Sequence, residues 1–228
     1  MAPRDYDIRV VDDVPRAFAE LVAEESPGSI ALSGGDTARA CYGLLADAGV
    51  EWGVVSVLFG DERWVPVDDP DSNEGMARKA FLDEVAVAAV HSLRHADPDH
   101  HAEPENAAGA YDALLRAGPP IGVVHLGVGP DGHTASLFPG DSAALGEGTR
   151  LVVVTGDGAH PHRRLTMTLP AIARARLVVF TVAGAGKAAV LARLVRGDDL
   201  PAARVRAERV VWLVDDAAAS SLAAAGLG

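Results

Sequence analysis

A histidine with a nearby carboxylate, His133 with Asp131, is the strongest candidate for acid–base chemistry in this sequence. Both residues follow an apolar stretch at 123–126, and an aspartate two positions away can orient a neutral imidazole or hold its charged form. Such a pair can take a proton from an attacking water. An ordinary loop is the alternative, in which Asp131 caps a short helix and His133 is only a polar loop residue.

Two other loops carry residues that could bind or polarise a substrate. The segment Ser33-Gly34-Gly35-Asp36-Thr37 follows an apolar strand and precedes a helix, so its glycines and free N–H groups suit a phosphate. Asp61 and Arg63 come shortly after the apolar run at 54–59 and would form a charged rim. The alternatives are a plain turn that caps the helix, and a solvated turn with paired charges.

Three cationic side chains complete the set of candidates. Arg163 and Arg164 precede Leu165-Thr166-Met167-Thr168, and Lys187 lies at the start of a predicted helix, where it could hold a phosphate as a point charge. An exposed, solvated position is the alternative for Lys187. The single cysteine, Cys41, lies on the apolar side of a predicted helix and is interpreted as a core residue.

Two glycine-rich strings suggest nucleotide binding, but both lack necessary parts. Gly127, Gly129 and Gly132 satisfy G-x-G-x-x-G, yet Pro130 removes a backbone donor and no acid for a ribose follows the next strand. The segment at 184–187 is not a P-loop, because the following residue is alanine where the magnesium-binding Ser or Thr belongs. We therefore predict no nucleotide cofactor.

Composition narrows the possible partners. The chain has 228 residues, 49% of them apolar, and a formal charge of −12, which opposes general affinity for nucleic acid or anionic lipid. No apolar stretch is long enough to span a membrane and the N-terminus lacks the pattern of a signal peptide, so we expect a cytoplasmic protein. The segment 91–104 is rich in His and Asp, which invites a metal-binding interpretation, but we favour a solvated loop and predict no metal.

Alternating β-rich and amphipathic segments must position these loops. The predicted strands are 8–11, 29–32, 54–59, 123–126, 151–154, 177–182 and 210–214, and the predicted helices are 15–25, 37–48, 74–85, 105–117, 187–195 and 217–225. This alternation predicts one Rossmann-like α/β domain over residues 1–228, doubly wound, with a mostly parallel sheet and helices on both faces. Ligands should bind beyond the carboxyl ends of the strands, where all the candidate loops lie.

Taken together, the motifs resemble those of the 6-phosphogluconolactonase family. The matching strings, in the family's order, are S-G-G-D-T at 33–37, D-E-R-W-V-P at 61–66, D-S-N at 71–73, G-x-G-x-D-G-H-T-A-S-L-F-P at 127–139, R-L-T-M-T at 164–168 and G-x-G-K at 184–187. One departure is Ala38, where the family usually has proline, and this should soften the start of a helix.

The resemblance implies hydrolysis of 6-phospho-D-glucono-1,5-lactone, a small phosphosugar lactone, with no cofactor. It implies that His133 activates water and that Asp131 orients the imidazole of His133. Asp61 and Arg63 would line the ring end of the substrate, with Arg63 stabilising the oxyanion. The phosphate would be held by Gly34, Gly35, Thr37, Arg164 and Lys187. Whether Arg163 joins them stays open.

Two other functions stay open on the sequence. Related sugar-phosphate isomerases and deaminases continue the D-G-H string into Asn-Glu-Pro, whereas Phe138 precedes Pro139 here, which favours lactone hydrolysis. A sugar-phosphate sensor without catalysis is the other alternative. The oligomeric state is not determined by the sequence, and a monomer is our expectation.

Overall fold

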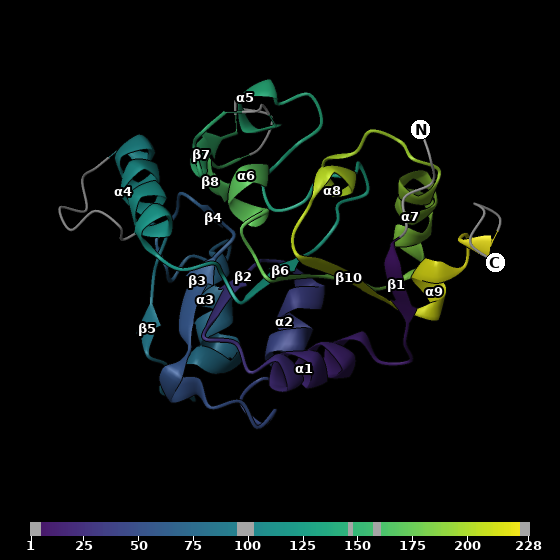
Figure 1. The fold of residues 1–228 in the computed structure, drawn as a ribbon, viewed down its shortest axis with the longest axis horizontal. Helices are drawn as coiled ribbons and strands as arrows, with labels where there is room; N and C mark the ends of the chain where they lie inside the picture. Colours follow the sequence, from purple (N-terminus) through teal and green to yellow (C-terminus); the bar gives the residue numbers. More distant parts are fainter. Residues whose placement is uncertain (1–5, 95–102, 146–147, 157–160, 224–228) are drawn as a thin grey trace.

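A parallel sheet of seven strands forms the centre of the protein in the computed structural model, which describes residues 6–94, 103–145, 148–156 and 161–223 (Figure 1). Every neighbouring pair in it is parallel, and the strand order is β1-β10-β9-β6-β2-β3-β5. The strands are β1 (Asp7–Val10), β2 (Ser29–Leu32), β3 (Ser56–Phe59), β5 (Ala89–Val90), β6 (Val123–Leu126), β9 (Leu177–Val182) and β10 (Arg209–Val214). The predicted doubly wound α/β fold is confirmed.

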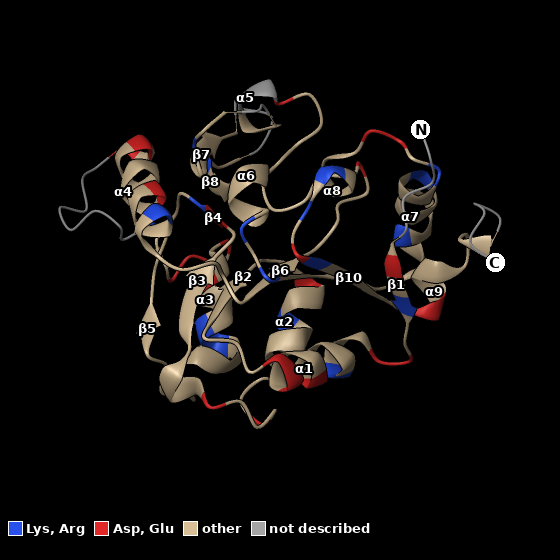
Figure 2. Ribbon diagram, viewed as in Figure 1, with Lys and Arg blue, Asp and Glu red and all other residues tan. Residues whose placement is uncertain are grey.

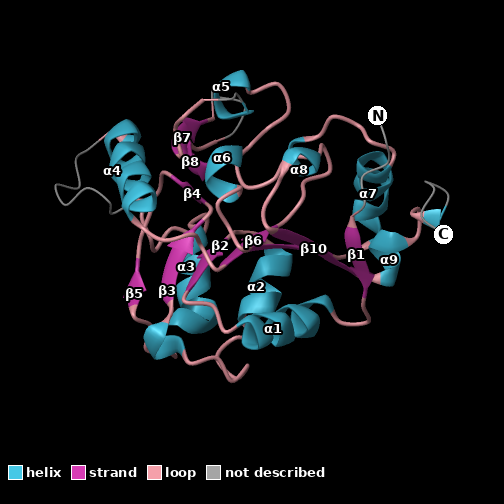
Figure 3. Ribbon diagram, viewed as in Figure 1, coloured by secondary structure: helices cyan, strands magenta, loops and turns pink. Residues whose placement is uncertain are grey.

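Helices lie on both sides of this sheet (Figure 3). They are α1 (Val14–Glu25), α2 (Asp36–Tyr42), α3 (Asn73–Ala77), α4 (Pro104–Ala117), α5 (Ser142–Leu145), α6 (Leu169–Ile172), α7 (Ala188–Val195), α8 (Pro201–Arg204) and α9 (Asp216–Ala219). Helix α1 shows the general pattern: Asp13 caps its first turn and Phe18 and Val22 on its apolar face are fully buried. Burial of such faces against buried strands supplies the main stabilisation of the fold.

A second, antiparallel sheet of three strands corrects the predicted topology. It has the order β4-β8-β7, with β4 (Asp61–Arg63), β8 (Arg164–Met167) and β7 (Val152–Thr155). The strand predicted at 151–154 therefore exists, but its assignment to the parallel sheet was wrong, because β7 pairs antiparallel with β8, the next strand along the chain. Gly60 joins the two sheets by donating to Leu32 O and accepting from Met167 N, both at 2.7 Å.

Some predicted helices are shorter than expected. The helix predicted at 37–48 ends as α2 at Tyr42, and the one predicted at 74–85 is divided between α3 and a π-helical turn at Arg78–Leu82. Short 3-10 turns at Trp52–Val54 and Ala185–Lys187 precede β3 and α7. Part of the helix predicted at 217–225, and most of the His- and Asp-rich segment, lie outside the described residues.

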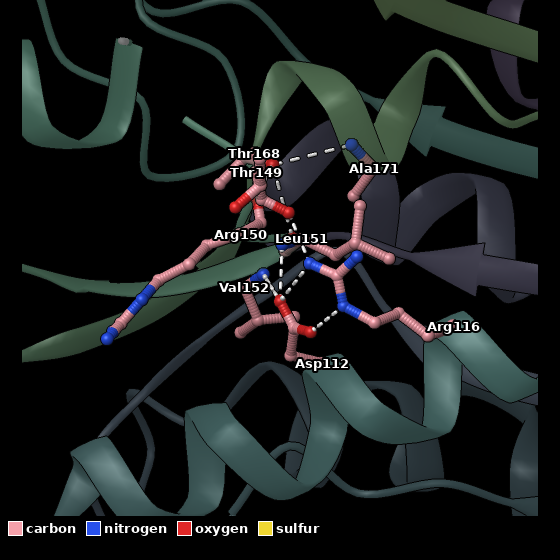
Figure 4. A network of polar contacts seen from close by, with 8 residues as sticks. All are labelled: Asp112, Arg116, Thr149, Arg150, Leu151, Val152, Thr168 and Ala171. Atoms are coloured by element: carbon pink, nitrogen blue, oxygen red, sulfur yellow. Dashed lines mark hydrogen bonds and ion pairs between the residues drawn. The ribbon is translucent and has the colours of Figure 1, made fainter. Parts of the chain in front are cut away.

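Helix α4 is tied to the small sheet by the carboxylate of Asp112 (Figure 4). This carboxylate accepts hydrogen bonds from the Arg116 guanidinium and from the backbone N–H groups of Leu151 and Val152 at the start of β7. Arg116 also donates to the carbonyl of Thr149. These contacts hold the first residues of β7 against α4.

None of the helices in the described ranges is long and apolar enough to cross a membrane. Acidic and basic residues are distributed over helices on both sides of the central sheet (Figure 2).

Candidate active site

A pocket of about 260 Å³ opens where the order of the central sheet reverses. The chain runs outward from β2 to β3 in one direction and from β6 to β9 and β10 in the other, so the loops after β2 and β6 diverge and leave a crevice. The lining comes from the loops that follow β2, β6 and β9 and from the small sheet. This is the place in an open α/β sheet where a ligand is expected.

The loop after β2 brings main chain close to the pocket. Gly35 has φ 101°, a conformation that favours glycine, and it precedes the first residue of α2. Gly34 is packed against Asn73, so that a Cβ placed on Gly34 would lie only 1.9 Å from Asn73 Oδ1. Thr37 in the first turn of α2 also lines the pocket. The two glycines therefore allow a ligand and a side-chain amide to approach the same short stretch of backbone.

His133 and Asp131 form a hydrogen-bonded pair, with 2.6 Å between His133 Nδ1 and Asp131 Oδ1. The backbone N–H of His133 donates to the same carboxylate at 3.1 Å. Although partial burial would raise the pKa of Asp131, the hydrogen bonds from His133 and its charge outweigh this and hold that pKa below its usual range. Gly129 is required beneath the ring, since a Cβ there would lie 2.1 Å from His133 Cε1.

Arg63 and Arg164 are direct neighbours, paired across β4 and β8 in the small sheet. Burial lowers the pKa of Arg164, and the charge of Arg63 lowers it further. The Nε atom of each arginine is buried and has no hydrogen-bond partner among the described residues. Arg63 Nη1 donates to the carbonyl of Asp71 at 2.6 Å, which leaves most of the paired donors available to an anion.

Arg163 does not line the pocket. Its guanidinium forms ion pairs with Glu105 and Glu103 at the surface. Successive side chains of a strand point to opposite faces, so Arg163 at the entrance to β8 points away when Arg164 points in.

Asp61 is the centre of a buried polar network at one wall of the pocket. It accepts from Ser136 Oγ at 2.6 Å, and Asn73 Nδ2 donates to its backbone carbonyl at 2.9 Å. Arg164 Nη1 lies 3.5 Å from the same Ser136 hydroxyl. The adjacent Glu62 points away from the pocket and accepts from the backbone N–H groups of Asn73 and Glu74 at the start of α3, 2.8 Å each.

Lys187 reaches the pocket from the turn that precedes α7. Its Nζ donates to the carbonyl of Val128 at 2.7 Å, in the loop that also carries His133. The ammonium group thus lies next to the histidine loop and has two further donors.

All the residues that the sequence assigned to the site gather at this pocket, whereas Arg163, which was left open, does not. Asp131 contacts His133, and the others line the pocket itself: Gly34, Gly35, Thr37, Asp61, Arg63, His133, Arg164 and Lys187. The lining also includes residues that were not predicted as site residues, among them Ser33, Asn73 and Thr181. Asn73 appeared in the sequence only as the last residue of the D-S-N string. No motif marks Thr181, although it lies near the carboxyl end of β9, where pockets are expected to form.

Comparison with known proteins places the chain in a family. The profile of the family described as glucosamine-6-phosphate isomerases/6-phosphogluconolactonase matches residues 3–212. The chain is 40% identical to a 6-phosphogluconolactonase of Synechocystis, over 92% of this chain and 90% of the relative, and 39% identical to one of Mycobacterium tuberculosis, over 90% of each. The crystal structure of 6-phosphogluconolactonase from Thermotoga maritima matches with a TM-score of 0.82 at 27% identity, covering 93% of this chain and 100% of that one.

The protein therefore belongs to the glucosamine-6-phosphate isomerase/6-phosphogluconolactonase family. Within it, the chain is an enzyme of the 6-phosphogluconolactonase type, as the sequence resemblance predicted.

Proposed function

We propose that this protein hydrolyses 6-phospho-D-glucono-1,5-lactone to 6-phospho-D-gluconate, the second step of the oxidative pentose phosphate pathway, by histidine-assisted attack of water. The observation that carries this proposal is one pocket lined by His133, which is hydrogen-bonded to Asp131, together with Arg63, Arg164 and Lys187. An imidazole can activate water there, and three cations can hold a phosphate dianion and a developing oxyanion.

His133 acts as the general base in this mechanism. Because Asp131 accepts a hydrogen bond at Nδ1, the proton of the neutral ring lies on Nδ1 and the lone pair of Nε2 is free to take a proton from water. The water then adds to the lactone carbonyl, and the ring oxygen leaves from the tetrahedral intermediate as the imidazolium returns the proton. The Asp131 carboxylate stabilises the imidazolium between these two steps.

The cations divide between the two polar ends of the substrate. Arg164 and Lys187, with the backbone of Gly34 and Gly35 and the side chain of Thr37, hold the phosphate, while Arg63 faces the carbonyl oxygen and Asp61 the ring hydroxyls. In a 1,5-lactone, the carbonyl carbon and the carbon that bears the phosphorylated arm are both bonded to the ring oxygen. The two anionic groups are therefore close together, which suits arginines that are neighbours across β4 and β8.

Phe138 favours lactone hydrolysis over ring opening of an amino sugar phosphate. Its ring centroid lies 4.9 Å from that of His133, and the Arg164 guanidinium carbon lies 5.7 Å from the ring centre. In the related deaminases this string carries the glutamate used in ring opening. An apolar ring cannot transfer that proton, whereas a lactone is an activated ester that needs no second acid, metal or organic cofactor.

A coupled assay tests the proposal directly. Lactone generated enzymatically from glucose 6-phosphate should disappear much faster with the protein than by spontaneous hydrolysis, with stoichiometric release of acid. His133→Ala should lower kcat by about 10²–10⁴-fold, because it removes a general base. His91→Ala is the matched control, since His91 lies beside another pocket, and it should leave the rate unchanged.

Two results would contradict the proposal. A wild-type protein that does not exceed the spontaneous rate rules out lactone hydrolysis, and formation of ammonia or a ketose phosphate from glucosamine 6-phosphate would favour the isomerase or deaminase alternative. If His133→Ala hydrolyses the lactone at the wild-type rate, the activity stands and the assignment of the base is wrong.

A further inference from the structure

A buried chain of three polar side chains lies directly behind the pocket. His125, in the middle of β6, has its Nδ1 atom 2.8 Å from Tyr42 Oη and its Nε2 atom 2.8 Å from Thr181 Oγ1. The histidine and the tyrosine are fully buried, and Thr181 is 4% exposed. This hydrogen-bonded chain links α2, β6 and β9 near the carboxyl ends of the inner strands, where the pocket opens.

The imidazole of His125 cannot take part in proton transfer with a ligand. Burial lowers the pKa of His125 to about 3, so the ring stays neutral at physiological pH. Phe18 covers it, with 4.2 Å between the ring centroids. A neutral imidazole has one donor and one acceptor, and the two hydroxyl partners satisfy both in either tautomer. A leucine would fill the same space without these requirements, so the polar chain calls for an explanation.

Both ends of this chain of hydrogen-bonded side chains reach the pocket. At one end, Tyr42 Oη accepts from the backbone N–H of Ser33 at 2.7 Å and lies 3.2 Å from its carbonyl oxygen, so it holds the residue that precedes Gly34 and Gly35. At the other end, Thr181 lines the pocket itself. The Ser33 hydroxyl is buried and has no partner among the described residues, although Ser33 also lines the pocket.

We propose that His125 is a positioning residue, which acts through Tyr42 and Thr181 to fix the glycine loop and the Ser33 hydroxyl in the geometry that binds the phosphate end of the substrate. This role rests on the proposed lactone hydrolysis. The loop contains two glycines, which leave its backbone with more freedom than any other residue type would. A tyrosine hydroxyl that bonds both main-chain groups of Ser33, and is itself held by His125, restricts that freedom before the substrate arrives.

A separation of KM from kcat distinguishes positioning from a general structural role. His125→Leu and Tyr42→Phe should each raise KM for the lactone, and Kd for 6-phosphogluconate, by about five- to tenfold, as expected for loss of a hydrogen bond or of preorganisation. The kcat value should stay within about twofold, because His133 and Asp131 are untouched. The double variant should raise KM by much less than the product of the two single effects, since both break the same chain.

Trp52→Phe is the matched control, because it also deletes a buried hydrogen bond, from Trp52 Nε1 to Leu45 O at 3.1 Å, but near the opposite ends of the strands. It should reduce thermal stability and leave KM unchanged. If the His125 and Tyr42 variants likewise lose only stability, the positioning role is wrong and the proposed function stands. If the wild-type protein neither hydrolyses the lactone nor binds 6-phosphogluconate, the proposed function itself fails.

Discussion

Gly34 lies so close to Asn73 that this wall of the pocket has no room for a side chain at position 34. In Gly34→Ala the new Cβ would meet Asn73 Oδ1 at 1.9 Å and must displace an amide that holds Asp61. We expect kcat/KM for the lactone to fall by about tenfold or more, the size of effect that small misplacements of binding groups produce.

Gly109→Ala provides the comparison for this variant. Gly109 is a helical residue of α4, and a Cβ placed on it has nothing within 4 Å. This variant should keep full activity and gain about 0.5–1 kcal/mol in unfolding free energy, because alanine is the better helix former. Steady-state kinetics and thermal unfolding of the two variants give the measurement, and equal kcat/KM values for both would show that the Asn73 contact is unimportant.

Individual residues of the site could be predicted where their chemistry is local. His133 and Asp131 are two positions apart, and a pair so close in sequence is close in space in almost any loop. Arg164 could not be distinguished from Arg163 in the same way. That choice depends on which of two successive side chains faces inward, and hence on the register of β8 against β4.

At the scale of elements, Asp112 is the residue on which the attachment of α4 to β7 depends. Asp112→Ala leaves two backbone N–H groups and the Arg116 guanidinium without their acceptor. We expect the free energy of unfolding to fall by about 1–3 kcal/mol, with a decrease in Tm of about 2–4 °C for each kcal/mol. Glu20→Ala, at an exposed position of α1, should change stability by less than about 0.5 kcal/mol.

The same contact predicts how this stability difference varies with pH. Burial alone would raise the pKa of Asp112, but the hydrogen bonds from Arg116 and Leu151 outweigh it and hold that pKa below its usual range. A carboxyl whose pKa is lower in the folded state stabilises the protein above the unfolded-state pKa, and this contribution disappears as pH falls through the folded-state value. Denaturant unfolding should therefore show a constant gap between wild type and Asp112→Ala above about pH 5, which narrows below about pH 4. A gap that widens in acid would contradict this assignment.

Strands and helices differ in how well the sequence predicts them. Three strands, β2, β6 and β9, match their predicted bounds because each is a buried, mainly apolar run of a parallel sheet. The short strands β4 and β8 were missed, since they begin with charged pocket residues and have no hydrophobic period of their own. Their pairing is a tertiary property, set by where the chain places Gly60 between the two sheets.

At the scale of the whole molecule, the cationic pocket contrasts with a net charge of −12. A bound anion relieves the repulsion between Arg63 and Arg164 and connects loops from both sheets, so it should stabilise the folded protein. With 6-phosphogluconate at about 100 times its Kd, we expect a gain of about 2.7 kcal/mol in unfolding free energy, or about 5–10 °C in Tm.

Lys187→Ala should reduce this thermal shift at the same ligand concentration, because it removes one charge from the pocket. Thermal scans with gluconate, which lacks the phosphate, provide the control and should show little change. A shift of equal size with gluconate would indicate that binding does not depend on the phosphate.

The small sheet has one more consequence, which concerns how the protein acquires its activity. Arg63 and Arg164 are direct neighbours in space but roughly 100 residues apart in the chain, and His133 and Lys187 follow the β2 loop by roughly 100 and 150 residues. Contacts between such distant segments close large loops and form slowly. During synthesis, the first half of the chain can emerge with β2, β3 and β4 and still have no functional pocket. The pocket therefore forms only after the segments up to Lys187 have been made and have packed together, which makes recovery of activity a sensitive reporter of refolding.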